Sequence, residues 1–181
     1  MKKLLIILSC ITLFLLLFFA DNIYGYYRFK QFCKNEGGLR VYGKLEKNVG
    51  WMAEDKYSAR SAAQLKYVDF VRYPDKRKKD TFYDMQYLGG HPGDNDSYLI
   101  NQADIDKPIK YKWKFTSGRL DDEIRLTRQM DEVFDIDGNL LISYKKYSYS
   151  IFDIGRTLLH SPSGIGCYNL SESIKLIKNL F

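Results

Sequence analysis

The stretch that decides the fold is residues 122–152, "DEIRLTRQMDEVFDIDGNLLISYKKYSYSIF". Apolar and polar residues alternate along both halves of it, which is typical of two strands that each bury one face. Between the halves lies "DIDGN" (residues 135–139), whose composition is typical of a tight turn. We therefore predict an antiparallel β-hairpin that turns at Gly138.

The phase of the alternation specifies the length of the turn. A two-residue Asp-Gly turn would place Phe134 opposite Leu141, and the apolar residues of the two strands would then lie on different faces. A three-residue loop, with Gly138 in the left-handed conformation, places Phe134 opposite Leu140 and gives the strands a common apolar face. The sequence therefore predicts the three-residue loop.

Later in the second strand the apolar residues move to odd-numbered positions such as Tyr147 and Tyr149. One extra residue at Lys145 or Lys146 would account for this shift, because a bulge places two residues opposite one. The bulge would bring Tyr149 opposite Leu126. We predict it at residues 145–146.

The clearest of the other strands is "IKYKWKF" (residues 109–115), in which apolar residues and lysines alternate. Further strands are expected at residues 39–42, 67–73 and 81–88, with helices at 24–36 and 58–66. The first helix should stop at Gly37 and Gly38, and residues 43–55 are expected to be irregular with Trp51 over the core. The predicted fold class is α+β: an N-terminal membrane helix, then a short helix or two packed on an antiparallel sheet of about four to six strands.

The N-terminus carries "LLIILSCITLFLLLFFA" (residues 4–20), which contains no charged residue. Its length is above the roughly 7 to 15 residues of a signal-peptide core and at the short end of the roughly 17 to 25 that span a bilayer. Lys2 and Lys3 precede it, and positive flanks stay in the cytoplasm. We predict a transmembrane anchor or signal segment at residues 1–23 and an exported globular domain at 24–181.

Two other fates of this segment remain open. Cleavage after Ala20 would leave a secreted or periplasmic protein, although Phe18 then occupies a position that favours small side chains. Lipidation at Cys10 would leave an apolar decapeptide at the new N-terminus. The preferred location is the inner (plasma) membrane, with a single N-terminal pass and the C-terminal domain in the periplasm or outside.

Export bears on the cysteines, because thiols outside the cytoplasm become oxidised. The exported part contains Cys33 and Cys167, and two cysteines allow one connectivity. The alternative is a pair of buried free thiols. We predict a Cys33–Cys167 disulfide, which would join both ends of the domain.

The segment "FCKNEGGLRVYG" (residues 32–43) resembles the opening of small exported bacterial proteins of no known activity. Their pattern is Cys, three residues, Gly-Gly, two residues, Val or Ile, then Tyr, and they also end near a cysteine. The resemblance covers Phe32 to Tyr42 and the late cysteine. It implies that Cys33 and Cys167 belong to one structural device, and it implies no activity.

Catalytic and metal-binding patterns are weak. His91 lies in "GGHPGDND" and His160 in "LLHSPSG", and neither has the spacing of a zinc, calcium or nucleophile motif. A hydrolase or metal-dependent enzyme that uses His91 or His160 is the alternative function. We predict no catalytic residue, no cofactor and no metal site.

Charge and aromatic content favour binding. The exported part carries about +4 once Lys2 and Lys3 are set aside, with a basic run at residues 76–79 that could meet an acidic surface or form a solvated turn. Nucleic acid is not expected as a partner of an exported domain. All 15 tyrosines follow position 23, more than one modest core needs. We predict a non-enzymatic binding or structural module of the bacterial cell envelope, with the membrane and an envelope protein as partners.

Overall fold

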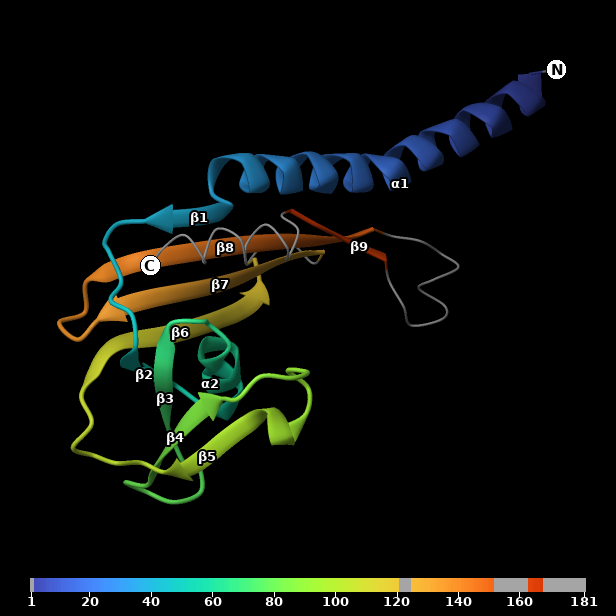
Figure 1. Ribbon diagram of the computed structural model, residues 1–181. Coiled ribbons are helices and arrows are strands. Elements are labelled where there is room, and N and C mark those ends of the chain that lie inside the picture. Colours follow the sequence, from blue (N-terminus) through green and yellow to red (C-terminus); the bar gives the residue numbers. More distant parts are fainter. Residues whose placement is uncertain (1, 121–124, 152–162, 168–181) are drawn as a thin grey trace. The chain divides into compact units, whose positions relative to one another are not determined.

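The computed structural model describes residues 2–120, 125–151 and 163–167 (Figure 1). Their helices are α1 (Lys2–Asn35), α2 (Lys56–Ala63) and the short 3-10 helix η1 (Asn95–Ser97). The protein is α+β, and the strands in chain order are β1 (Gly38–Val41), β2 (Val49–Ala53), β3 (Val68–Pro74), β4 (Phe82–Tyr87), β5 (Tyr98–Gln102), β6 (Ile109–Arg119), β7 (Leu126–Asp135), β8 (Leu140–Ile151) and β9 (Ser163–Gly166).

These strands form one mixed sheet of nine, which corrects the predicted antiparallel sheet of four to six. Their order is β1-β8-β7-β6-β2-β3-β4-β5. Strand β8 is long enough to pair with β1 at residues 142–145 and with β9 at residues 148–151. Strand β2 makes the sheet mixed, because it runs parallel to both β3 and β6. The short strands β2, β5 and β9 account for most of the difference in number.

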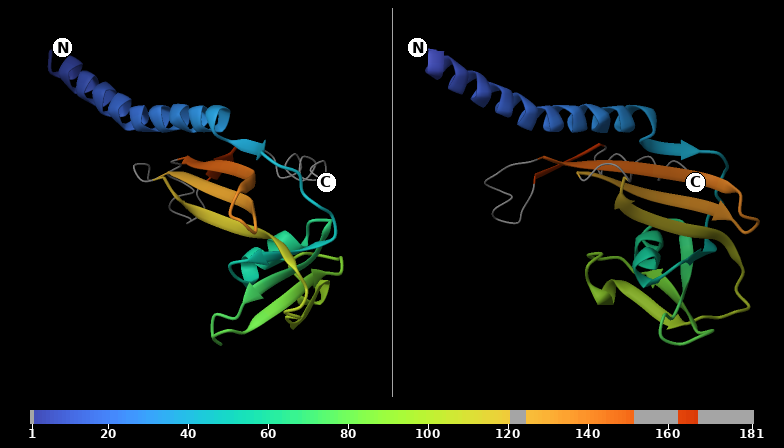
Figure 2. Two further views of the ribbon diagram at one scale, coloured as in Figure 1. Left: turned by 90° about the vertical axis from the view of Figure 1, so that its left-hand side faces the viewer. Right: turned by 180° about the vertical axis from the view of Figure 1, so that it is seen from behind.

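Strand β2 falls in the segment that was expected to be irregular. Its five residues include Gly50, which weakens the β signal, and both faces are largely buried, so that no alternation marks it. Trp51 on this strand is fully buried, which confirms the prediction that it packs in the core. The crossover from β2 to the parallel β3 runs through α2, which packs on β3 and β2 (Figure 2).

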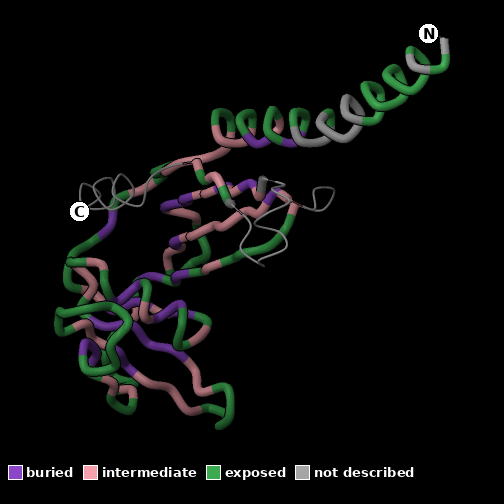
Figure 3. Tube along the Cα trace, turned by 90° about the vertical axis from the view of Figure 1, so that its right-hand side faces the viewer, coloured by how far each residue is buried: buried purple, intermediate pink, exposed green. Residues whose placement is uncertain are grey.

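The first helix is a second correction. α1 is one continuous helix of 34 residues, not a membrane helix followed by a separate short one. Over the described part of the chain, no helix has the length and apolarity needed to cross a membrane. The apolar run occupies only the first part of α1, which continues into a segment with Arg28 and Lys30. The apolar side chains described from Leu5 to Phe14 are exposed (Figure 3).

The end of α1 was predicted correctly. The N–H groups of Glu36 and Gly37 both donate to the carbonyl oxygen of Phe32, at 3.0 and 2.9 Å. Gly38 follows with a φ of +96°, a conformation that favours glycine. The two glycines therefore stop the helix and start β1.

The described residues fall into two compact units. The first takes its residues from 1–37, 118–128 and 146–167, and the second from 38–117 and 129–145. The core of the first unit is small and aromatic: Phe29, Leu126, Tyr147 and Tyr149. The core of the second unit lies between α2 and the strands around it, and its largest members include Trp51, Met85, Tyr98, Tyr111 and Trp113.

The hairpin of β7 and β8 has the predicted three-residue loop. The Asp135 N–H donates to the Asn139 carbonyl at 3.0 Å, and Gly138 has a φ of +91°. Further along, the Ser150 N–H donates to the Arg125 carbonyl at 2.9 Å. Between these two bonds, the β8 strand contributes residues 140–149 and the β7 strand residues 126–134, so β8 has one residue more. An extra residue is therefore present, as the shift in apolar positions predicted.

Candidate functional site

The second unit contains a hollow that begins where α2 begins. Asp55 caps this helix: its Oδ1 accepts hydrogen bonds from the N–H and the hydroxyl of Ser58, both at 2.8 Å. Its Oδ2 accepts a hydrogen bond from Lys76 Nζ at 3.0 Å. The Ser58 N–H bond and Lys76 lower the pKa of Asp55 to about 2. The cap therefore stays ionised and ties the turn after β3 to the start of α2.

The floor of the hollow is formed by side chains of the neighbouring strands β3, β4 and β5. Tyr73 on β3 is the registered partner of Tyr83 on β4, and their ring centroids lie 5.9 Å apart. Ile100 on β5 also lines the floor. The hollow has a volume of about 670 Å³, which is in the range of small-molecule sites.

The Tyr73 hydroxyl is the most informative group of the floor. Tyr73 is only 5% exposed, and its hydroxyl has no hydrogen-bond partner among the residues that the structure describes. Burial raises the pKa of Tyr73, so the phenol remains a hydrogen-bond donor at neutral pH. A ligand oxygen in the hollow would give this donor an acceptor.

The rim combines an exposed aromatic ring with two cations. Tyr57 is 69% exposed, although it lies at the start of α2 beside Phe115. Lys56 and Arg77 line the same hollow, and neither side chain has an ion-pair partner within the described part of the chain. Lys76 differs from them because its ammonium group is bonded to Asp55. The free positive charge at the rim therefore comes from Lys56 and Arg77.

The acidic residues of the lining are already engaged. Asp55 caps α2, and Asp75 Oδ1 accepts a hydrogen bond from the Arg77 N–H at 2.8 Å. The Asp75 N–H itself donates to the Thr81 carbonyl, also at 2.8 Å. The hollow thus offers aromatic faces, a hydroxyl donor and cations, a set that suits an anionic ligand with both apolar and polar groups.

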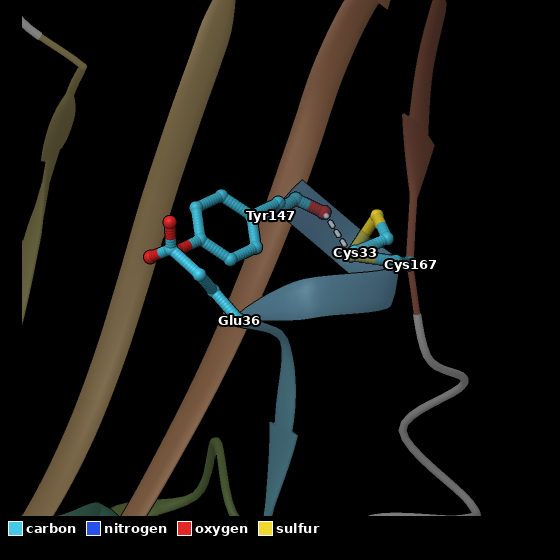
Figure 4. The surroundings of a disulfide bond; sticks show 4 residues. All are labelled: Cys33, Glu36, Tyr147 and Cys167. Atoms are coloured by element: carbon cyan, nitrogen blue, oxygen red, sulfur yellow. Dashed lines mark hydrogen bonds between the residues drawn. A yellow bond between two sulfur atoms is a disulfide. The ribbon is translucent and has the colours of Figure 1, made fainter. Parts of the chain in front are cut away.

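The two predicted site cysteines lie in the first unit, where the structure joins them as a disulfide (Figure 4). Their Cα atoms are 5.7 Å apart, an ordinary separation for a disulfide. The Cys167 N–H donates to the Tyr147 carbonyl at 3.0 Å, and the Tyr147 ring stacks on Phe32 at 5.3 Å. The bond therefore joins the last turn of α1 to the residue that follows β9, and both cysteines pack against the aromatic core.

The predicted alternative site residues are not brought together in the described structure. The His91 side chain is 78% exposed on a loop, where its Nδ1 accepts from the Gly93 N–H at 3.1 Å and lies 4.0 Å from Asp94 Oδ1. His160 lies outside the described residues. Within these residues, no three His, Cys, Asp or Glu side chains could hold a metal ion together.

Sequence reasoning found part of the hollow. It singled out the basic run at residues 76–79, of which Lys76 and Arg77 line the hollow, and it expected an exposed tyrosine surface. It did not select Tyr57, Tyr73 or Tyr83. The alternation in residues 67–73 and 81–88 could have placed Tyr73 and Tyr83 on one face, but their register depends on strand pairing.

The comparisons with known proteins add no family to these observations. No protein-family model, curated protein or solved structure matches the chain.

Proposed function

We propose that the protein is an exported, disulfide-bonded, non-enzymatic binding module of the bacterial cell envelope, and that it takes up its ligand in the hollow of the second unit. The observation that carries the proposal is the lining of the hollow, which combines the Tyr73 hydroxyl with the exposed Tyr57 ring and the cations of Lys56 and Arg77. The hydroxyl bonds to no other described residue and is not one of their fully buried unpaired polar atoms, so water reaches it. A ligand that displaces this water can accept its hydrogen bond.

Two further features support a binding role. Tyr57 exposes a large ring at the edge of the hollow, and tyrosine is enriched at sites of molecular contact because it joins a broad apolar face to a polar tip. Lys56 and Arg77 line the same hollow. The hollow thus has the mixed apolar and polar lining that is typical of recognition sites.

Export remains a prediction from the apolar N-terminal segment and the cysteine pair. The disulfide supports it, because such bonds persist in oxidising surroundings. Contact of α1 with the membrane and an envelope protein as partner likewise stay predictions. The mass of the native protein, measured with and without reductant and thiol labelling, would report cleavage, lipidation and the disulfide in one experiment.

The binding role is tested by photocrosslinking from the hollow in intact cells. A benzophenone amino acid replaces Tyr57 in the full chain, and a matched variant carries it at Tyr42, which is 59% exposed but does not line the hollow. We expect an adduct from position 57 and a much weaker one from position 42. Equal labelling from both positions, or none from position 57, would contradict the proposal.

A further inference from the structure

We propose that the ligand of the hollow is an anionic saccharide, a sugar chain that carries carboxylate groups. This inference rests on the proposed function and specifies the chemistry of the ligand. It follows from four features of the hollow: the exposed parts of its tyrosine rings, the Tyr73 hydroxyl, the cations without an ion-pair partner in the described residues, and the engaged backbone N–H groups of Asp75 and Arg77.

The floor fits the face of a sugar ring. Tyr73 is only 5% exposed, so the ring faces that a ligand can reach belong to the half-buried Tyr83 and to Tyr57, which is 69% exposed. A pyranose ring has an apolar face of C–H groups and an edge of hydroxyls. The C–H face can lie on the tyrosine rings while an edge oxygen accepts from the Tyr73 hydroxyl, which burial keeps protonated.

The rim determines the charge of the ligand. Three cationic side chains and two carboxylates line the hollow, so its lining carries a net charge of +1. Lys76 pairs with Asp55, whereas Lys56 and Arg77 have no ion-pair partner in the described residues. A guanidinium group binds a carboxylate through two parallel hydrogen bonds, and an ammonium group adds a point charge. A carboxylated ligand is therefore favoured over a neutral one.

The size of the hollow excludes a simple anion as the whole ligand. A volume of about 670 Å³ is far more than one carboxylate or phosphate group needs. The hollow is also open to solvent, so a chain longer than the bound part can extend beyond it. A ligand of several sugar units fits these dimensions.

An acidic peptide is the main alternative to a saccharide as the ligand. The backbone of residues 74–77, which line one wall of the hollow, argues against it. Peptides that add to a sheet depend on main-chain hydrogen bonds. Pro74 has no N–H group, the Asp75 N–H donates to the Thr81 carbonyl, and the Arg77 N–H donates to the Asp75 side chain. These three residues offer a peptide no backbone donor, whereas a saccharide needs only the side chains.

Calorimetric titration of the full chain tests the proposal. The probes are trigalacturonate and a hyaluronan hexasaccharide, with the neutral sugars maltotriose and chitohexaose as controls. We expect at least one acidic probe to bind about tenfold more tightly than its neutral control, and the difference should shrink at high salt because the rim charges are exposed. Equal binding of acidic and neutral probes, or no binding of either acidic probe, overturns the proposal.

Two variants assign the binding to the hollow. Tyr73→Phe removes one hydroxyl and should weaken acidic-probe binding about fivefold, the value of one hydrogen bond. Arg77→Gln should weaken it about tenfold and reduce its salt dependence. Tyr42→Phe and Lys44→Gln make the same changes at exposed positions outside the hollow and should bind like the unmodified protein. Binding that is unaffected by both hollow variants, with melting temperatures unchanged, also overturns the proposal.

The crosslinked adduct separates this inference from the proposed function. An adduct at position 57 that is digested by glycosidases supports both. An adduct that is a protein leaves the binding module standing and rejects the saccharide. The absence of a position-specific adduct rejects the binding function itself.

Discussion

The Tyr147 hydroxyl donates a 3.0 Å hydrogen bond to Oε2 of Glu36, a residue 111 positions earlier in the chain. Burial, with Glu36 as a second cause, raises the pKa of Tyr147 to about 12, so the phenol keeps its proton throughout the neutral range. The same tyrosine stacks on Phe32 and accepts from the Cys167 N–H through its carbonyl. Tyr147 thus contacts the last turn of α1, the residue that follows this helix and Cys167 of the disulfide.

Tyr147→Phe tests this hydrogen bond, because it removes the hydroxyl and keeps the ring. We expect a loss of about 1–2 kcal/mol of unfolding free energy, since the acceptor is a carboxylate that water can partly solvate again. Thermal or urea unfolding measures it. Tyr42→Phe, at an exposed tyrosine, should leave the stability unchanged. An equal effect of the two variants would show that the Glu36 bond contributes nothing.

Removal of the disulfide should destabilise the first unit. Because the bond closes a loop of 134 residues, the double variant Cys33→Ser, Cys167→Ser is expected to lose about 2–4 kcal/mol. Reductant should lower the melting temperature of the natural protein and leave that of the double variant unchanged. Cys10→Ser provides the control, since Cys10 has no bonded partner. A melting temperature that does not respond to reductant would contradict the bond.

A buried ion pair lies on the second unit. Arg72 on β3 binds both carboxylate oxygens of Asp84 on β4, through Nε at 2.8 Å and through Nη2 at 3.0 Å. Arg72 also donates to the carbonyl oxygen of Asp104, and the Asp104 N–H donates to Asp84 Oδ2 at 3.2 Å. The pair therefore fixes the loop between β5 and β6, and Asp84 raises the pKa of Arg72.

Arg72→Met should lose about 3–5 kcal/mol, because it leaves the Asp84 carboxylate buried without its partner. The double variant Arg72→Met, Asp84→Leu should recover a part of this loss, since no unpaired charge remains, although the Asp104 contacts stay broken. Urea unfolding of the two variants measures the difference. If the double variant is no more stable than the single one, desolvation of Asp84 is not the cause.

Because of Asp131 on β7, we expect the stability of the fold to depend on pH above pH 4. Burial raises its pKa to about 6, so the folded state binds a proton more tightly than the unfolded state does. Stability should therefore fall as the pH rises from about 4 to about 6, by up to about 2–3 kcal/mol, and then stay level. Asp55 affects stability in a different pH range. Because its pKa is lowered, it stabilises the folded state above about pH 4, and this stabilisation is lost as the pH falls below that value.

Asp131→Asn removes this titration and should stabilise the protein at pH 7 while changing little at pH 4. Asp137→Asn, in the exposed hairpin loop, is the matched control. Urea midpoints at pH 4, 5, 6 and 7 would show the dependence. If the urea midpoint of Asp131→Asn still falls as the pH rises from 4 to 6, another group causes the pH dependence.

The sequence determined features that depend on near neighbours. The loop at Gly138, the stop of α1 at Gly37 and Gly38, the alternating faces of β6 and the extra residue in β8 all follow from turn chemistry and side-chain period. The cysteine pair followed from the expected export of the domain and from the number of its cysteines. In each case the evidence lies within one segment or in a count of residues.

Only the tertiary structure decided which segments lie beside one another. Strand β2 has no alternation of its own, and its parallel pairing with β3 and β6 depends on the α2 crossover. Tyr73 and Tyr83 meet because β3 and β4 pair in one register. The hollow could therefore not be read from the sequence, since long-range pairing sets it and no local pattern records that pairing.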